Sequence, residues 1–390
     1  MRCEIGVIGN GAVGKAVALG FAQAGFQVIL LGPSDRAATV RAISPEWDAR
    51  VFALNHTAKN LLSKLKVWDA LDLQRVAPIE SMQVFDDAGA ALNLDAYAAY
   101  QNELAWIVED QNLNQALDAA LRFAPNVQLM TGKTVAMSAD FSELTLENGA
   151  TLQAELWVGA DGAQSWLRNQ ADIGLDYRSY DQRGVVANFS CAKPHHGIAH
   201  QWFIGEQGIV ALLPLPGQQV SLVWSAPEAL AVTLLGETTH QLAQRLARYC
   251  GEVLGELVPL PPQRVQAFPL NFISPHSIIG PRLALVGDAA HVVHPLAGHG
   301  MNLGFADVVA LLQTVAEREA WRSCGDTRVL QRYARARKED VLLMQLATDG
   351  LSRLFGSQLS PLQTVRNMGM TIVNKLPFLK KQLILQAMGK

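Results

Sequence analysis

Residues 287–304, GDAAHVVHPLAGHGMNLG, contain four glycines, three histidines and one aspartate within eighteen positions. Two kinds of chemistry fit these residue types. Histidines together with a carboxylate are ligands for transition metals. Glycines in front of a helix instead let backbone N–H groups approach an anion such as a phosphate. The two interpretations predict different proteins, and the rest of the sequence decides between them.

The spacing of the histidines does not favour a metal site. His291, His294 and His299 are separated by three and five positions, so they do not stack on one face of a helix. Proline and glycine residues interrupt the segment, and no cysteine or further carboxylate completes a good ligand set. We therefore predict no metal and expect the histidines to satisfy local hydrogen bonds or to line a pocket.

A second glycine-rich segment, GNGAVG at residues 9–14, supports the phosphate interpretation. Gly9, Gly11 and Gly14 match the pattern G-x-G-x-x-G directly after a predicted strand and before a predicted helix. In this pattern the first glycine permits a tight turn, the second lets a pyrophosphate approach the backbone, and the third lets the helix pack against the strand. The segment therefore predicts dinucleotide binding.

The acidic residue that usually binds the ribose of such a dinucleotide is missing. It is expected at the end of the second strand, residues 27–32, where this chain has Gly32. The nearest acid is Asp35, which we include among the predicted cofactor-binding residues. The sequence leaves three alternatives open. Asp35 can reach back to the ribose, Arg36 or water can take the place of the missing acid, or the affinity for the dinucleotide is simply lower.

A third segment, VGADGAQSWLR at residues 158–168, has an acid and a glycine at the end of a predicted strand. In one interpretation the backbone turns sharply beside a cofactor at Asp161, and Ser165 and Arg168 follow at fixed spacing, the arginine supplying a charge. In the other interpretation the segment is an ordinary turn that opens a helix, with Asp161 as its cap. Taken alone, the segment favours neither.

Gly287 and Asp288 follow a buried strand, residues 282–286, which delivers them to the edge of a sheet where α/β proteins bind ligands. A carboxylate there can accept hydrogen bonds from sugar or ribitol hydroxyls. The helix predicted at 303–315 is preceded by three residues near its N-terminus, Gly298, Gly300 and Asn302. Its backbone amides are expected to face an anion. Both glycine turns then serve one long cofactor, which requires Gly11 and Asp288 to line the same cavity.

The remaining pattern places these motifs in an α/β framework that is interrupted once. The predicted elements are strands at 3–8 and 27–32, a helix pattern between 100 and 124, alternating residues at 127–158, β-rich segments at 183–226, a helix at 239–250, a strand at 265–268 and helices beyond 328. The β-rich segments are short and separated by glycine and proline turns, so they indicate a separate antiparallel sheet. The chain then returns to the first domain near residue 282.

Composition limits the remaining possibilities. A chain of 390 residues is long enough for two interleaved domains, and 49% hydrophobic with 17% charged residues indicate a cavity or an apolar patch. A net charge of −3 provides no basic surface for nucleic acid. The four cysteines have no CxxC spacing, the N-terminus does not look like a secretory signal, and no run of about 18 apolar residues occurs. We therefore expect a cytoplasmic protein without disulfides.

The three segments together resemble motifs of the group A flavoprotein monooxygenases, aromatic hydroxylases that share the fold of 4-hydroxybenzoate hydroxylase. GNGAVG is similar to their ADP-binding turn, ADGAQSWLR to their D-G motif, and VGDAAHVVHPLAGHGMNLG to their G-D motif and flavin loop. The resemblance implies an α/β fold (α+β overall), in which a Rossmann-like FAD-binding domain carries an inserted antiparallel β-sheet substrate domain and a helical C-terminus. The implied boundaries are 1–75, 98–175 and 278–340 for the FAD-binding domain, 76–97 and 176–277 for the substrate domain, and 341–390 for the C-terminal segment.

Further segments resemble the ubiquinone-biosynthesis hydroxylases, relatives of polyprenyl-methoxyphenol and demethoxyubiquinol hydroxylases. These segments are WDARVFALN (47–55), LAWIVEDQNLNQAL (104–117), IVALLPLPGQQVSLVWS (209–225), QAFPLN (266–271), HPLAGHGMNLGFADV (294–308), RYARARKEDVLLMQLATDGLSRLF (332–355) and VRNMGMTIVNKLPFLKKQL (365–383). The C-terminal segments are the most informative, because the G-x-G-x-x-G turn implies nothing about them. Two positions depart from the family pattern: Gly32, and His299, where glutamine is common in relatives.

Carried over by position, the resemblance implies an FAD site built from all three motifs. The implied cofactor-binding residues are Gly9, Gly11 and Gly14 for the ADP part, Asp35, Arg50 along the cofactor, Asp161 at the D-G turn, Gly287 and Asp288 at the ribitol and pyrophosphate, and Pro295, Gly298, Gly300, Met301 and Asn302 at the flavin. Pro295 is expected over the reactive face of the isoalloxazine ring. His294 and His299, with Pro295, are the candidate catalytic residues on that face.

The implied activity is a monooxygenase reaction. NAD(P)H reduces the flavin, O₂ adds to give a C4a-hydroperoxide, and one oxygen atom enters the aromatic ring of a polyprenylated phenol or quinol intermediate in ubiquinone biosynthesis. This chemistry requires an apolar pocket that excludes water, for which the strands at 209–215 and 219–224 are candidates. Oxygen substituents already activate such rings, so a dedicated base is not required.

The C-terminal residues 376–390 place leucines beside lysines, which indicates a surface element that meets lipid or a partner; a packed helix with solvated lysines is the alternative. The family resemblance adds an expected complex with other quinone-biosynthesis proteins and peripheral contact with the inner face of the membrane. Two other functions fit the same motifs: hydroxylation of a soluble aromatic substrate, and non-catalytic binding of prenyl chains.

Overall fold

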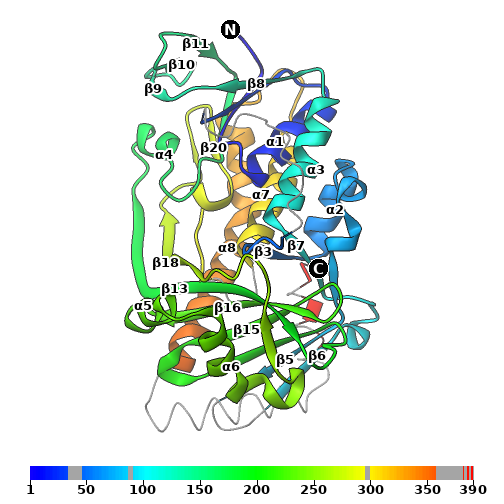
Figure 1. The fold of residues 1–390 in the computed structure, drawn as a ribbon. Coiled ribbons are helices and arrows are strands. Elements are labelled where there is room, and N and C mark those ends of the chain that lie inside the picture. Colours follow the sequence, from blue (N-terminus) through cyan, green and yellow to red (C-terminus); the bar gives the residue numbers. More distant parts are fainter. Residues whose placement is uncertain are drawn as a thin grey trace.

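The computed structural model of the chain describes residues 1–33, 46–86, 91–294 and 299–356, together with 381, 384, 385, 388 and 389. Two large sheets organise it, with most of the helices packed beside the first and two against the second (Figure 1). Among the described helices, none is long and apolar enough to cross a membrane.

The first sheet is built mainly from parallel strands and carries the glycine turns. In spatial order its strands are β19 (Ile279–Gly280), β20 (Leu283–Leu285), β12 (Leu156–Gly159), β1 (Ile5–Ile8), β2 (Val28–Gly32) and β8 (Val127–Thr131). β1, β2, β12 and β20 are buried along their whole length, as expected for strands covered on both faces. The strands predicted at residues 3–8, 27–32 and 282–286 are thereby confirmed.

Helices α1 (Ala12–Gln23), α3 (Asp110–Arg122), α7 (His299–Ala316) and α8 (Thr327–Gly356) pack against one another beside this sheet (Figure 1). The helix pattern predicted between residues 100 and 124 is wrong at its start. Residues 105–109 form β7 (Ala105–Glu109), which pairs with β3 (Val51–Leu54) and β4 (Ala77–Ile79) in a small sheet. Pairing with the neighbouring strands therefore overrides the local helical pattern of residues 105–109. Helix α2 (His56–Lys64) follows β3 in the chain.

The alternating residues at 127–158 divide between two sheets. β8 joins β2 in the parallel sheet, whereas β9 (Thr134–Met137), β10 (Glu143–Leu146) and β11 (Thr151–Gln153) form a separate three-stranded antiparallel sheet. The predicted meander is therefore present, and β12 returns the chain to the centre of the parallel sheet, between β1 and β20.

The second large sheet has the strand order β17 (Leu257–Pro259), β13 (Leu175–Cys191), β16 (Gln219–Pro227), β15 (Ile209–Leu215), β14 (Ile198–Phe203), β5 (Ser81–Phe85) and β6 (Ala91–Asp95), and β18 (Gln266–Pro275) also pairs with β13. Helices α5 (Glu228–Gly236) and α6 (Thr239–Leu254) pack on it. The antiparallel sheet predicted from 183–226 is confirmed. Sequence analysis missed α5, whose apolar residues do not gather on one face.

A buried hydrogen bond fixes α8 against the parallel sheet. Tyr333 of α8 is fully buried and donates its hydroxyl to the backbone oxygen of Leu285, 2.7 Å away at the end of β20. β20 leads directly into the Gly287–Asp288 turn, so this bond ties the turn to a helix about fifty residues further along the chain.

We expect Tyr333→Phe to lower the free energy of unfolding by about 1–2 kcal/mol, because it removes one buried hydrogen bond and little volume. Urea denaturation of the purified protein measures the change. Tyr97→Phe is the matched control, because Tyr97 is 81% exposed, and it should change the free energy by less than about 0.5 kcal/mol. Equal effects of the two variants would contradict the role assigned to Tyr333.

Candidate functional site

A cavity of about 1340 Å³ lies between the two large sheets. The ends of β1, β2 and β12 line one side of it, and residues of β13, β15, β16 and β18 line the other. Gly11 and Asp288, which lie on separate turns, both line this cavity. The geometric condition set by the sequence, that one ligand can touch both, is therefore met.

The turn at residues 9–14 is shaped by close contact between backbones. Gly9 has φ of +110°, and a Cβ there would lie 2.1 Å from the oxygen of Ala160. A Cβ on Gly14 would lie 1.9 Å from the oxygen of Gly9, whereas a Cβ on Gly11 would meet nothing within 4 Å. Gly11 thus leaves the backbone open toward the cavity at the N-terminus of α1, where unpaired N–H groups favour an anion.

Asp161 has one carboxylate oxygen committed to the fold and one that is buried and unpaired among the described residues. Its Oδ2 accepts a hydrogen bond from the backbone N–H of Leu167 at 3.0 Å, and its Oδ1 is buried without a hydrogen-bond partner among the described residues. The cap of α4 (Trp166–Gln170) is Ser165, whose Oγ accepts from the N–H of Arg168 at 3.0 Å. Ser165 is therefore the N-cap residue, Asp161 accepts from a second N–H of the same first turn, and Asp161 is among the residues that line the cavity.

The side chain of Arg168 joins two of the turns. Its Nη2 donates to the oxygen of Ala163 at 2.7 Å and its Nη1 to the oxygen of Ala289 at 3.0 Å. The guanidinium is buried and is not among the cavity-lining residues. Its charge thus holds the D-G turn against the G-D turn, and does not reach into the cavity.

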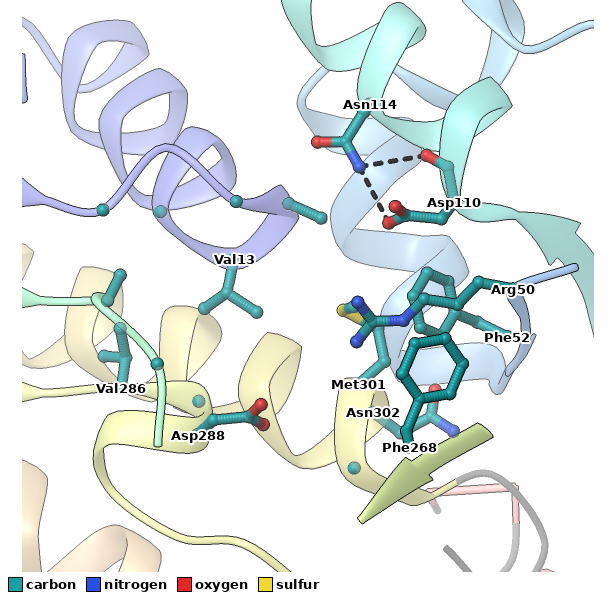
Figure 2. A pocket seen from close by; sticks show the side chains of 18 of the residues that line it. Val13, Arg50, Phe52, Asp110, Asn114, Phe268, Val286, Asp288, Met301 and Asn302 are labelled. Carbon is teal, nitrogen blue, oxygen red and sulfur yellow. Dashed lines mark hydrogen bonds between the residues drawn. The ribbon is translucent and has the colours of Figure 1, made fainter. Parts of the chain in front are cut away.

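Asp288 projects into the cavity opposite Arg50, so that a carboxylate and a guanidinium face each other across open space (Figure 2). Gly287, the preceding residue, has φ of +60°. Although open to the cavity, the carboxyl group lies deep inside the molecule. This burial raises the pKa of Asp288, and the nearby charges of His291 and Arg50 oppose the shift. The exposed carboxylate can accept hydrogen bonds from the hydroxyls of a ligand in the cavity.

Asp307, on α7, holds the G-D turn from behind. Its carboxylate accepts hydrogen bonds from the N–H of Gly287 at 2.9 Å, from Nε2 of His291 at 2.7 Å and from Nε of Arg337 at 2.7 Å. Complete burial would raise the pKa of Asp307, but the charges and hydrogen bonds of His291 and Arg337 outweigh burial and lower it. Sequence analysis missed this residue, although a single aspartate within the apolar run GFADVVALL was a signal for it.

The first turn of α7 reaches the cavity through Gly300, Met301 and Asn302. The side chain of Asn302 is used for structure: its Oδ1 accepts from the N–H of Asn55 at 2.9 Å, and its Nδ2 donates to the oxygen of Ala53 at 2.8 Å. These bonds fix the start of α7 against the end of β3. The backbone of this first turn is the part that a ligand can use.

Arg50 is placed by a chain of polar contacts. A buried carboxylate, Glu109, accepts from Nε of Arg75 at 2.6 Å and from the N–H of Asp48 at 2.6 Å. Asp48 in turn accepts from the N–H of Arg50 at 3.0 Å, and the guanidinium of Arg50 lies 5.3 Å from the ring centre of Phe52. The segment before β3 is thereby held beside the cavity.

The other predicted site residues are placed as follows. Asp35, Pro295 and Gly298 lie outside the described residues, and His299 begins α7. His294 is fully buried, shares a hydrogen bond with Oε1 of Gln182 at 3.0 Å and does not line the cavity. Its catalytic role stays a prediction.

The histidines of the G-D segment have separate partners. His291 pairs with Asp307, whereas His294 contacts Gln182 and lies edge-on to the ring of Tyr180 with centroids 4.9 Å apart. In the part of the chain that the structure describes, no three histidine, cysteine or acidic side chains form a group that could hold a metal ion.

The fold and the cavity define a class of protein. The FAD binding domain family matches residues 2–344 of the chain. Two solved structures share the fold: p-nitrophenol 4-monooxygenase PnpA from Pseudomonas putida DLL-E4, with TM-score 0.76 and 18% identity over 99% of this chain and 98% of that one, and P. aeruginosa PqsL in complex with 2-aminobenzoylacetate, with TM-score 0.76 and 20% identity over 95% and 100%. The chain is an FAD-dependent monooxygenase.

Sequence relatives narrow this class. The 3-demethoxyubiquinol 3-hydroxylase of Escherichia coli (strain K12) is 35% identical over 99% of this chain and 98% of its own length. Ubiquinone hydroxylase UbiL of Rhodospirillum rubrum is 32% identical over 99% and 89%, and the mitochondrial ubiquinone biosynthesis monooxygenase COQ6 of Drosophila melanogaster is 30% identical over 99% and 90%. The chain belongs to the family of ubiquinone-biosynthesis hydroxylases, which confirms the predicted family and its cofactor.

We expect Asp307→Asn to weaken FAD binding at least about tenfold and to lower the free energy of unfolding by about 3–5 kcal/mol, because it removes the buried carboxylate that pairs with Arg337 and loosens Gly287. Flavin fluorescence titration of the apoprotein measures the affinity. Asp340→Asn is the control, because Asp340 also binds Arg337, at 2.8 Å, but its side chain is 66% exposed. Its effect on stability should be below about 1 kcal/mol. Unchanged FAD affinity in Asp307→Asn would refute the role of Asp307.

Two buried histidines predict a loss of stability in acid. Burial lowers the pKa of His294 to about 4, and burial lowers the pKa of His200 to about 4 as well. Since an unfolded histidine has a pKa of about 6.5, only the unfolded state takes up these protons between about pH 6.5 and pH 4. Stability is therefore expected to fall as pH falls through this window, by about 1.4 kcal/mol per pH unit for each histidine.

Replacing one of these two histidines should remove its contribution to the pH dependence of the unfolding free energy. We expect His294→Gln to show a shallower loss of unfolding free energy between pH 6.5 and pH 4 in urea titrations. The control is His276→Gln, whose side chain is 65% exposed and should leave the slope unchanged. An identical slope in His294→Gln and in the unsubstituted protein would contradict the prediction.

Proposed function

We propose that this protein uses FAD, NAD(P)H and O₂ to hydroxylate the aromatic ring of a polyprenylated phenol or quinol during ubiquinone biosynthesis. The observation that carries the proposal is how polar and apolar residues are distributed along the cavity. Its lining is polar at the glycine turns and mainly apolar against the second sheet. The names of the relatives support ubiquinone precursors as the substrate class.

The polar end fits FAD. Gly11 leaves room for a pyrophosphate at the N-terminus of α1, and Gly9 and Gly14 permit the close backbone contacts that shape this turn. The carboxylate of Asp288 is an acceptor for ribitol hydroxyls, Asp161 lines the same end of the cavity, and Arg50 offers a positive charge along the cofactor.

Bound FAD would supply the redox chemistry, taking up hydride from NAD(P)H and activating O₂. The role that we assign to the N–H groups at the start of α7 is to stabilise negative charge at the pyrimidine end of the ring. Pro295, His294 and His299 stay the predicted residues on the flavin face, and Gly298 and Asp35 stay predicted cofactor-binding residues.

The apolar end fits a prenyl chain. Its lining includes Met82 of β5, Leu94 of β6, Leu104 just before β7, Leu213 of β15 and Ile384 of the C-terminal segment. Each methylene buried against such a wall contributes about 0.8 kcal/mol, so a chain of isoprene units binds more tightly than a bare ring. The same wall keeps water from the reacting atoms. Peripheral membrane contact and a complex with other quinone-pathway proteins stay predictions from the family.

The test compares a prenylated phenol with a soluble hydroxybenzoate under ¹⁸O₂, following NAD(P)H oxidation and the mass of the product. We expect one ¹⁸O atom in the prenylated product and little turnover of the benzoate. Turnover of the benzoate alone would favour a hydroxylase of soluble aromatics. FAD binding without any turnover of either would favour a binding protein.

A variant pair on β6 locates the prenyl chain. Leu94 lines the cavity, whereas Leu92, two positions earlier on the strand, packs against the cluster of Val84, Phe203 and Ile209. Leu94→Trp should lower kcat/KM for the prenylated phenol about tenfold or more by filling the space of two or more methylenes, and should affect an unprenylated analogue less. Leu92→Trp should change both substrates equally. Equal losses in Leu94→Trp would place the chain elsewhere.

A further inference from the structure

The end of β2 lacks the side chain that usually binds the adenosine ribose. Folds of this type place an acidic residue at this point, where it accepts hydrogen bonds from the ribose hydroxyls. This chain has Gly32, which ends β2 and lines the cavity together with Asn10 of the glycine turn. The question is which group, among the residues described, takes over the ribose.

The side chain of Asn10 occupies the place of the missing one. A Cβ built on Gly32 would lie 2.2 Å from Nδ2 of Asn10, 2.3 Å from its Cγ and 2.8 Å from its Cβ. At these distances, a side chain at position 32 would force that of Asn10 to move from its present position. Gly32 and Asn10 therefore depend on each other. The side-chain amide of Asn10 occupies the space that the first atoms of an acidic side chain at position 32 would fill.

The position of Asn10 is fixed by its neighbours in the chain. Gly9 donates its N–H to the oxygen of Leu31 at 2.8 Å, and Ile8 pairs in register with Leu31. The backbone of the turn is thus bonded to β2 one residue before Gly32. The amide of Asn10 makes no hydrogen bond that involves another described residue, and it carries both an acceptor, Oδ1, and two donor hydrogens on Nδ2.

We propose that Asn10 binds the adenosine ribose hydroxyls of FAD through its side-chain amide, in place of the missing acid, and that position 32 is glycine because Asn10 fills its space. The proposal rests on FAD as cofactor and is independent of the substrate. In this arrangement the neutral amide of Asn10 takes the place of a charged carboxylate. Its Oδ1 accepts a hydrogen bond from one ribose hydroxyl, and its Nδ2 donates to the oxygen of the other.

Two charged residues that line the same cavity are the competing candidates. Lys133 follows β8 and Glu147 follows β10, and the N–H of Glu147 donates to the oxygen of Lys133 at 2.9 Å. Glu147 carries the carboxylate that the family pattern expects, but it comes from the small antiparallel sheet and not from β2. A Glu147→Gln variant therefore separates the two assignments.

The first experiment measures FAD affinity of the apoprotein by flavin fluorescence. Asn10→Ala should bind FAD about tenfold more weakly, as expected for the loss of one or two hydrogen bonds. Gly32→Glu should also bind more weakly, because the new side chain collides with Asn10. The double variant Asn10→Gly/Gly32→Glu should bind more tightly than either Asn10→Gly or Gly32→Glu alone, because it restores the acid and removes the collision.

Controls separate this effect from misfolding. Asn93→Ala, an exposed asparagine of β6, should leave FAD affinity unchanged. The urea unfolding midpoint of each apoprotein reports whether the variant is folded, and FMN, which lacks the adenosine, should bind Asn10→Ala as it binds the unsubstituted protein.

The second experiment removes the hydroxyls from the ligand. ADP, 2′-deoxy-ADP and 3′-deoxy-ADP are compared as competitors of FAD. The unsubstituted protein should prefer ADP over at least one deoxy analogue by about tenfold, and Asn10→Ala should lose this preference. The proposal is overturned if Asn10→Ala keeps the full preference, or if Glu147→Gln abolishes it.

Discussion

The whole site depends on direct contact between the backbones of turns that are far apart in the chain. A Cβ at Gly9 would collide with Ala160, and a Cβ at Gly304 would lie 3.2 Å from the Cα of Gly287 and 2.8 Å from the side chain of Val13. Close-packed interiors cannot absorb such overlaps without moving the elements apart. The glycines therefore set the distance between the sheet edge and the helices, and with it the width of the cavity between the two large sheets.

Carboxylates around the cavity divide into two groups with different tasks. Asp307 and Glu109 are buried and fully engaged by arginines and backbone N–H groups, so they hold turns in place. Asp288 faces the cavity and has capacity left for a ligand. A buried carboxylate is tolerated when hydrogen bonds and ion pairs satisfy both of its oxygens. A carboxylate without such partners marks a place where a ligand can supply them.

The second large sheet makes the opposite wall of the cavity apolar. β13, β15, β16 and β18 contribute apolar side chains to the wall opposite the glycine turns, and β5 and β6 extend this wall. A site of this kind combines charged and hydroxyl-binding groups at one end with a water-excluding surface at the other. This combination suits a reaction in which a hydrophilic cofactor meets a hydrophobic ring.

The amino-acid sequence by itself determined the features that depend on local backbone geometry. Glycine turns after buried strands, the D-G and G-D motifs, the antiparallel segment at 183–226 and the family all follow from residue types at fixed spacing, because a tight turn or a positive φ restricts the residues that fit. Only the tertiary structure decided that residues 105–109 pair as a strand, that Ser165 is the N-cap residue of α4, that Asp307 anchors Gly287, and that Asn10 fills the space at Gly32. Each of these involves side chains or strands brought together by the fold, often from distant parts of the chain, and such contacts leave no regular spacing from which they can be predicted.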